Sequence, residues 1–162
     1  MTHWSRWLEG GRPHAAIALA ALAAVGAALV TQHGFGMLPC AWCVLQRMIF
    51  VVIALVALPA AAVAALRRPL AALTALLATG GAAAALWQHF VAASSTSCKL
   101  TLADRLIAAS GLDALLPSVF APWASCADAA VRLLGLPYEA WSLALFIVIA
   151  AVAVAALLRG RR

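Results

Sequence analysis

Charged residues are scarce in this chain. Only 10% of its 162 residues are Asp, Glu, Lys or Arg, whereas 67% are apolar. A soluble domain of this length has too small an interior to bury so many apolar side chains. The composition therefore excludes a soluble globular protein and predicts an integral membrane protein.

Long polar segments are also few. A transmembrane helix needs about 20 mostly apolar residues to cross roughly 30 Å of hydrocarbon. Four segments meet this requirement, at residues 15–31, 44–66, 70–90 and 141–158, and loops 32–43 and 91–140 connect them on one side of the membrane. These spans predict an all-α fold, a four-transmembrane-helix bundle that forms a single membrane domain over residues 1–162.

Acidic residues number five against eleven Lys and Arg, which gives a formal net charge of +6. Such a charge can indicate nucleic-acid binding, but most of these basic residues flank the predicted spans. If the spans alternate in direction, one side of the membrane holds these arginines: Arg6, Arg12, Arg67, Arg68, Arg159, Arg161 and Arg162. The positive-inside rule then places that side and both termini in the cytoplasm. Topology thus explains the charge, and no nucleic-acid partner is predicted.

The loop 91–140 is the one long polar segment, and it is not featureless. Thr101 and Asp104 fit a capping box, which predicts a short helix that ends at Gly111. Residues 112–123 are too apolar for a free loop and too short to span the membrane. We expect them to form a short helix or segment in the membrane interface. Packing on the outer ends of the bundle is the alternative.

Cysteine is limited to four positions, all on the predicted outer side: Cys40, Cys43, Cys98 and Cys126. Disulfides form readily in an oxidising compartment such as the bacterial periplasm. The CxxC pair, Cys40 and Cys43, lies at a helix start, where the helix dipole lowers the pKa of a thiol and makes a disulfide easily reduced. Cys98 and Cys126 fit either a structural bridge or a second redox pair. Because they lack CxxC spacing, no zinc site is predicted.

Two further residues are candidates for binding a ring next to the CxxC pair. Arg47 follows Cys43 by four residues and shares its helical face, so its cation can stabilise a thiolate or hold an electron-rich ring. An arginine inside the membrane boundary is usually functional, although a snorkelling interfacial arginine is the alternative. His89, at the outer end of the third span, can protonate or hydrogen-bond such a ring. An ordinary interfacial histidine is its alternative.

Taken together, these features closely resemble the DsbB family of bacterial disulfide bond formation proteins, and the resemblance covers nearly the whole chain. Its motifs are Pro39-Cys40-x-x-Cys43-x-x-Gln46-Arg47, Gln88-His89, the loop with Cys98 and Cys126, and Gly135-Leu136 before Trp141. The sequence departs from the familiar family pattern at Gln46, where a Glu is usual.

The resemblance implies a multi-pass enzyme of the bacterial inner membrane, with its active sites facing the periplasm. Such an enzyme re-oxidises a periplasmic thioredoxin-like oxidase, DsbA, and passes the electrons to ubiquinone or menaquinone. In this family pattern, DsbA attacks Cys98, which frees Cys126 to attack Cys40. Cys43 then donates to the quinone, with Arg47 and His89 at the ring.

Two other functions also fit parts of the pattern. A vitamin K epoxide reductase-like enzyme likewise couples a CxxC motif to a quinone. In that family, however, the loop cysteines precede the CxxC motif, whereas here they follow it. A non-enzymatic membrane protein stapled by disulfides would use the same cysteines only for stability. A mixture of purified protein, quinone and reduced DsbA distinguishes these possibilities, because only the DsbB-like function predicts stoichiometric quinone reduction.

Overall fold

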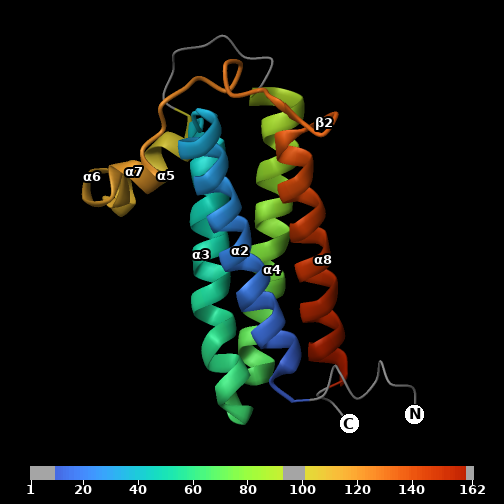
Figure 1. Cartoon of the computed structure of the whole chain (residues 1–162). Coiled ribbons are helices and arrows are strands. Elements are labelled where there is room, and N and C mark those ends of the chain that lie inside the picture. The colour runs from blue at the N-terminus through green and yellow to red at the C-terminus, as the bar shows by residue number, and fades with distance from the viewer. Residues whose placement is uncertain (1–9, 93–100, 160–162) are drawn as a thin grey trace.

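The computed structural model describes residues 10–92 and 101–159. Cys98 and the arginines at positions 6, 161 and 162 lie outside these ranges. Four long helices run up and down side by side (Figure 1), and they are α2 (Arg12–Phe35), α3 (Ala41–Ala62), α4 (Arg67–Trp87) and α8 (Tyr138–Arg159). Each is long and apolar enough to cross a membrane, with α4 counted together with its flanking turns. The predicted all-α membrane protein with a four-transmembrane-helix bundle is confirmed.

The ends of the helices follow from local backbone chemistry. Pro13 occupies the first turn of α2, where its missing N–H is not needed, and Gly36 ends the helix in the left-handed conformation. Cys40 is the N-cap of α3: its backbone is extended, and the helix begins at the next residue, Ala41. Pro59 lies in the last turn of α3, which ends at Ala62 rather than at the predicted residue 66. A short 3₁₀ turn, η1 (Ala64–Leu66), then leads into α4.

The described residues between α4 and α8 lie at and beside the upper end of the bundle in Figure 1. A π-helical turn, η2 (Gln88–Ala92), ends the third span. The later part of the loop holds α5 (Leu102–Ser110), α6 (Leu112–Leu115) and α7 (Pro117–Phe120), which project to one side near the upper end of α3 (Figure 1). A two-residue hairpin of β1 (Arg132–Leu133) and β2 (Leu136–Pro137) then leads into α8.

The short loop helices confirm the predicted capping box. Thr101 Oγ1 accepts the N–H of Asp104, and the Asp104 carboxylate accepts the N–H of Thr101. Gly111 ends α5 with φ of 67°. One face of this segment packs on the bundle through the buried side chains of Ile107 and Phe120. The other face exposes apolar side chains, namely Leu102, Leu106, Leu115, Leu116 and Trp123. Packing on the bundle therefore accounts for one face, and insertion into the interface stays a prediction for the other.

Two stacked aromatic rings pack α3 against α8 in the middle of the bundle. Phe50 of α3 and Phe146 of α8 stack with their centroids 4.0 Å apart and their planes 2° from parallel. Gly81 of α4 lies directly against Phe146, so closely that a Cβ atom added there would overlap the ring. Small residues allow such close approach where lipid supplies no hydrophobic drive between helices.

The neighbouring glycines of α4 provide a matched test of this packing. Gly81→Ala should destabilise the protein by about 1–3 kcal/mol, because the stacked Phe146 ring must move. Gly80→Ala meets no atom within 4 Å, so it should be neutral or slightly stabilising through helix propensity. Unfolding in mild detergent, followed by circular dichroism, measures both. Equal stability of the two variants would contradict this account of the helix contact.

Candidate active site at the loop end of the bundle

The CxxC pair sits at the first turn of α3. The extended backbone of Cys40 places its sulfur above the helix end, where it accepts the N–H of Cys43 at 3.4 Å. The two sulfur atoms are 2.9 Å apart. Cys40 is fully buried and Cys43 is partly exposed. This geometry allows a disulfide to form and open without a rearrangement of the helix.

Cys126 lies beside this pair, although it is distant in sequence. The N–H groups of Trp123 and Ala124 donate to the carbonyl of Pro39 at 2.9 and 3.3 Å, which fixes the loop over the start of α3. Cys126 packs on the same buried cluster as Cys40, and the two thiols are hydrogen-bonded. The structure thus brings three of the four cysteines together, and Cys98 is outside the described residues.

The hydrogen bond between Cys40 and Cys126 shifts the pKa values of the two thiols in opposite directions. Hydrogen bonds with Cys126 and Cys43, together with burial, raise the pKa of the Cys40 thiol. The hydrogen bond from Cys40 lowers the pKa of the Cys126 thiol, although burial acts in the opposite direction. Cys126 is therefore the thiol that more readily becomes a thiolate, the nucleophilic form of cysteine.

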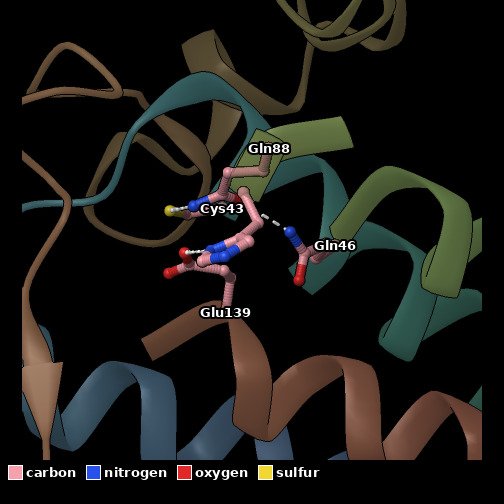
Figure 2. A network of polar contacts seen from close by, with 5 residues as sticks. Cys43, Gln46, Gln88 and Glu139 are labelled. Atoms are coloured by element: carbon pink, nitrogen blue, oxygen red, sulfur yellow. Dashed lines mark hydrogen bonds and ion pairs between the residues drawn. The ribbon is translucent and has the colours of Figure 1, made fainter. Parts of the chain in front are cut away.

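Two glutamines hold the sulfur of Cys43 from the other side (Figure 2). Gln88 Nε2 donates to Cys43 Sγ at 3.2 Å, and Gln46 Nε2 donates to Gln88 Oε1 at 2.7 Å. Both amides are buried. Neither glutamine is predicted as a site residue from the sequence, although both belong to the family motifs. Gln46 lies three residues after Cys43 and thus on the same helical face, which is the one local indication of its role.

Arg47 is buried and joins three parts of the chain. One terminal nitrogen donates to Gln32 Oε1 of α2 at 2.9 Å and also to the carbonyl of Val119 in α7. Gln32 in turn donates to the carbonyl of Ser118 at 3.1 Å. The Nε atom of Arg47 has no hydrogen-bond partner within the described ranges. Arg47 therefore anchors α7 and retains an unused donor.

A cavity of about 390 Å³ opens beside these residues, between α2, α3 and α8. Its polar lining residues include Cys43, Gln46, Arg47, Gln88, Tyr138 and Glu139, all at the loop end, as well as Thr31 and Ser142. Much of the remaining wall is apolar, with alanines of α2, Phe50 and Leu145 among its residues. Small-molecule sites typically have volumes of about 300–1,000 Å³, apolar walls and a few polar groups.

His89 does not line this cavity. Its Nδ1 atom lies 2.7 Å from Oε1 of Glu139, and its side chain is 45% exposed. Glu139 is buried, lines the cavity and belongs to the first turn of α8. Glu139 falls within the loop 91–140 predicted from the sequence, and nothing local in the sequence indicates which way the first turn of α8 faces.

The comparison with known families decides among the interpretations of this site. A family model described as Disulfide bond formation protein DsbB matches residues 12–156. The chain belongs to the DsbB family. The matched region contains all four cysteines, the two glutamines and Glu139, so the DsbB resemblance noted in the sequence is confirmed.

Individual DsbB relatives match over most of their length. Disulfide bond formation protein B of Herminiimonas arsenicoxydans is 36% identical over 141 residues, covering 83% of this chain and 87% of that protein. Disulfide bond formation protein B 1 of Pseudomonas savastanoi pv. phaseolicola is 34% identical, with coverage of 87% and 85%. The Ralstonia nicotianae protein is 33% identical, with coverage of 90% and 92%. DsbB membership assigns this multi-pass membrane protein a role in disulfide bond formation.

The hydrogen bond between Cys40 and Cys126 predicts how the reactivity of the Cys126 thiol depends on pH in this DsbB-family protein. In reduced Cys98→Ser protein, Cys126 should be alkylated at lower pH than an ordinary thiol of pKa about 8.5. Adding Cys40→Ala removes the hydrogen-bond donor, so the alkylation profile of Cys126 should move to higher pH. Peptide mapping by mass spectrometry after iodoacetamide pulses measures the rate at this one residue. An unchanged profile would contradict the proposed effect of Cys40.

Proposed function

We propose that this protein re-oxidises a periplasmic DsbA-like oxidase and passes the electrons to a membrane quinone, ubiquinone or menaquinone. The observation that best supports this function is the continuous series of thiols from the loop to the cavity. Cys126 contacts Cys40, Cys40 contacts Cys43, and Cys43 lines the cavity. A structural staple would require none of these contacts with a cavity.

The disulfide exchange begins in the loop. A thiolate of the reduced partner attacks Cys98 of a Cys98–Cys126 disulfide, which forms a mixed disulfide and releases Cys126 as a thiolate. Cys126 then attacks Cys40 of the Cys40–Cys43 disulfide and releases Cys43 as a thiolate. The lowered pKa of Cys126 and its hydrogen bond to Cys40 support this order.

The exchange is completed when the second thiolate of the partner resolves the mixed disulfide. The partner leaves oxidised, and Cys98 is free to attack Cys126 in the Cys126–Cys40 disulfide. This restores Cys98–Cys126 and leaves Cys40 and Cys43 as a dithiol. Two electrons have then moved from the partner to the CxxC pair.

The cavity fits a quinone head group. Its apolar walls suit the ring, and Arg47 is among its polar lining residues, so the guanidinium group is close enough to bind a ring oxygen. When bound, a quinone supplies a two-electron acceptor that also takes up two protons. Gln88, oriented by Gln46, holds the Cys43 sulfur at the cavity wall. Among the described residues, His89 is linked to the cavity wall through Glu139, so we assign it an indirect role.

Energetics also favour a strong terminal acceptor. DsbA has a reduction potential near −120 mV, whereas ordinary structural disulfides lie below about −300 mV. Oxidation of DsbA by an ordinary disulfide would therefore be uphill by about 8 kcal/mol, at roughly 1.4 kcal/mol per 30 mV. Coupling of the loop disulfide to a quinone through Cys40 and Cys43 removes this difficulty.

The arrangement of charge supports an inner-membrane location with the thiols in the periplasm. The described arginines at the ends of the long helices lie opposite the loop helices (Figure 1), and they are Arg12, Arg67, Arg68 and Arg159. By the positive-inside rule that end is cytoplasmic. We propose one membrane domain, residues 1–162, with both termini in the cytoplasm.

The decisive experiment combines purified protein, reduced DsbA and a soluble quinone. We expect one quinone to be reduced for each DsbA oxidised, as followed by quinone absorbance and thiol titration. DsbA oxidation without quinone consumption would contradict the proposed function, and so would a complete lack of DsbA oxidation.

Cysteine variants should separate the two halves of the relay. Cys98→Ser should abolish transfer from DsbA, while quinone still oxidises the Cys40–Cys43 pair. Cys43→Ser should block quinone reduction and still allow a mixed disulfide between DsbA and Cys98. Non-reducing gels and mass spectrometry detect these species. A Cys98→Ser protein that oxidises DsbA at the normal rate would refute the proposed order.

Arg47 variants should affect the quinone step. Loss of a charge-assisted hydrogen bond costs about 1.5–3 kcal/mol, so Arg47→Ala should weaken apparent quinone affinity by roughly tenfold to a hundredfold. Arg47→Lys keeps the charge without the planar fork and should have a milder effect. Quinone titrations measure the affinity, with Arg68→Ala at the opposite end as the control. An unchanged affinity in Arg47→Ala would leave Arg47 with only its role as an anchor for α7.

A further inference from the structure

Glu139 is an unusual residue for the wall of an apolar cavity. It is 7% exposed and lies in the first turn of α8. Its carboxylate pairs with His89, and this is the sole ion pair found within residues 10–92 and 101–159. A buried carboxylate is costly unless it is paired, and ionisable groups at membrane depth usually have a function.

Favourable helix electrostatics do not explain this placement. An acidic residue in the first turn of a helix interacts well with the positive end of the helix dipole. That interaction is available to an exposed carboxylate, and it requires neither burial nor a histidine partner. The position of Glu139 between the cavity and His89 therefore points to another role.

The two residues connect the cavity with the outside of the protein. Glu139 faces the cavity, whereas His89, in the π-helical turn η2, is largely exposed at the loop end of the bundle. The other titratable groups of the cavity wall have different partners. Cys43 contacts Cys40 and Gln88, Arg47 contacts Gln32 and Val119, and the Tyr138 hydroxyl contacts Thr31. Within the described part of the chain, Glu139 alone links this wall to an exposed ionisable side chain.

We propose that Glu139 and His89 form a proton-transfer pair that serves the cavity. This inference rests on the proposed quinone-linked function. Reduction of a quinone to a quinol takes up two electrons and two protons. A Cys43 thiolate and a Cys40 thiol release two electrons but only one proton when they form a disulfide. The second proton therefore has to enter from water.

The geometry provides the route for this proton. The carboxyl group of Glu139 gives a proton into the cavity, takes another from His89, and His89 takes its replacement from water. Glu139 is the proton-transfer residue at the cavity, and His89 acts through it as a positioning and relay residue. Their contact at 2.7 Å is within hydrogen-bond distance, as such a transfer requires.

Single-turnover kinetics test this pair. Quinone-free protein with a reduced CxxC pair is mixed with a short-chain quinone in H₂O and in D₂O. Glu139→Gln keeps the size of the side chain and removes its acidic proton, so quinone reduction should slow by at least about tenfold, with a larger solvent isotope effect. Glu139→Asp should restore part of the rate. His89→Gln should slow the reaction in the same way.

Matched controls separate proton transfer from a general loss of structure. His33 is also at this end of the bundle, but it contacts the carbonyl of Ser118 and does not line the cavity. His33→Gln and Asp113→Asn should therefore react like the unmodified protein, and mixed-disulfide formation with DsbA should be normal in every variant. A normal rate and isotope effect in Glu139→Gln would overturn this inference alone. Failure of the unmodified protein to reduce quinone would overturn the proposed function instead.

A second measurement needs no quinone. The charges of Glu139 and Cys43 interact, so a change of redox state in the CxxC pair should perturb the Glu139 carboxyl group. The reduced-minus-oxidised infrared difference spectrum of quinone-free protein should contain a carboxyl band that Glu139→Gln lacks and Asp113→Asn retains. Identical spectra for the unmodified protein and Glu139→Gln would contradict the proposal.

Discussion

The carbonyl of Pro39 accepts the backbone N–H groups of Trp123 and Ala124, and the rest of the site depends on this contact. Cys40 is the extended N-cap of α3 and its own carbonyl accepts the first helical hydrogen bond, so the carbonyl of Pro39 lies outside the helix and is available to the loop. Because the loop is tied here, Cys126 lies next to Cys40 rather than free in water. A single backbone carbonyl thus joins two distant parts of the chain at the point where disulfides can exchange.

Several buried polar side chains at this end of the bundle are hydrogen-bonded within an otherwise apolar protein. Gln32, Gln46, Arg47 and Gln88 are all buried, and each donates a hydrogen bond to another part of the chain. Unpaired polar groups at this depth would cost several kcal/mol each. The network therefore fixes the relative positions of α2, α3, α4 and α7 around the CxxC pair. The stacked Phe50 and Phe146 rings hold the helices below it.

The sequence was most informative where a single local rule applies. Hydropathy located the four membrane helices, although α2 extends to Phe35 and η1 takes over after Ala62. The capping box at Thr101 was also predictable, because its two partners are close in sequence. The family motifs likewise identified the CxxC pair and the DsbB family.

Long-range contacts were beyond such local rules. Gln88 reaches Cys43 from a different helix, and the π-helical turn that begins there has no simple sequence rule. The direction in which Glu139 points depends on how α8 packs against its neighbours. The anchoring of α7 by Arg47 depends likewise on the path of the whole loop. For these residues, the sequence gives the chemical type of each side chain, but it does not reveal which residues each side chain contacts.

The chain of two glutamine amides has a consequence for the energetics of electron transfer. The oxygen of Gln88 is occupied by Gln46, so its nitrogen is directed at the Cys43 sulfur. This orientation does not depend on the charge of the sulfur, because a neutral neighbour fixes it. The dipole therefore does not need to rotate when Cys43 changes between a thiolate and a disulfide. Such a preset environment lowers the reorganisation energy of the site, in contrast to water, which would reorient at every turnover.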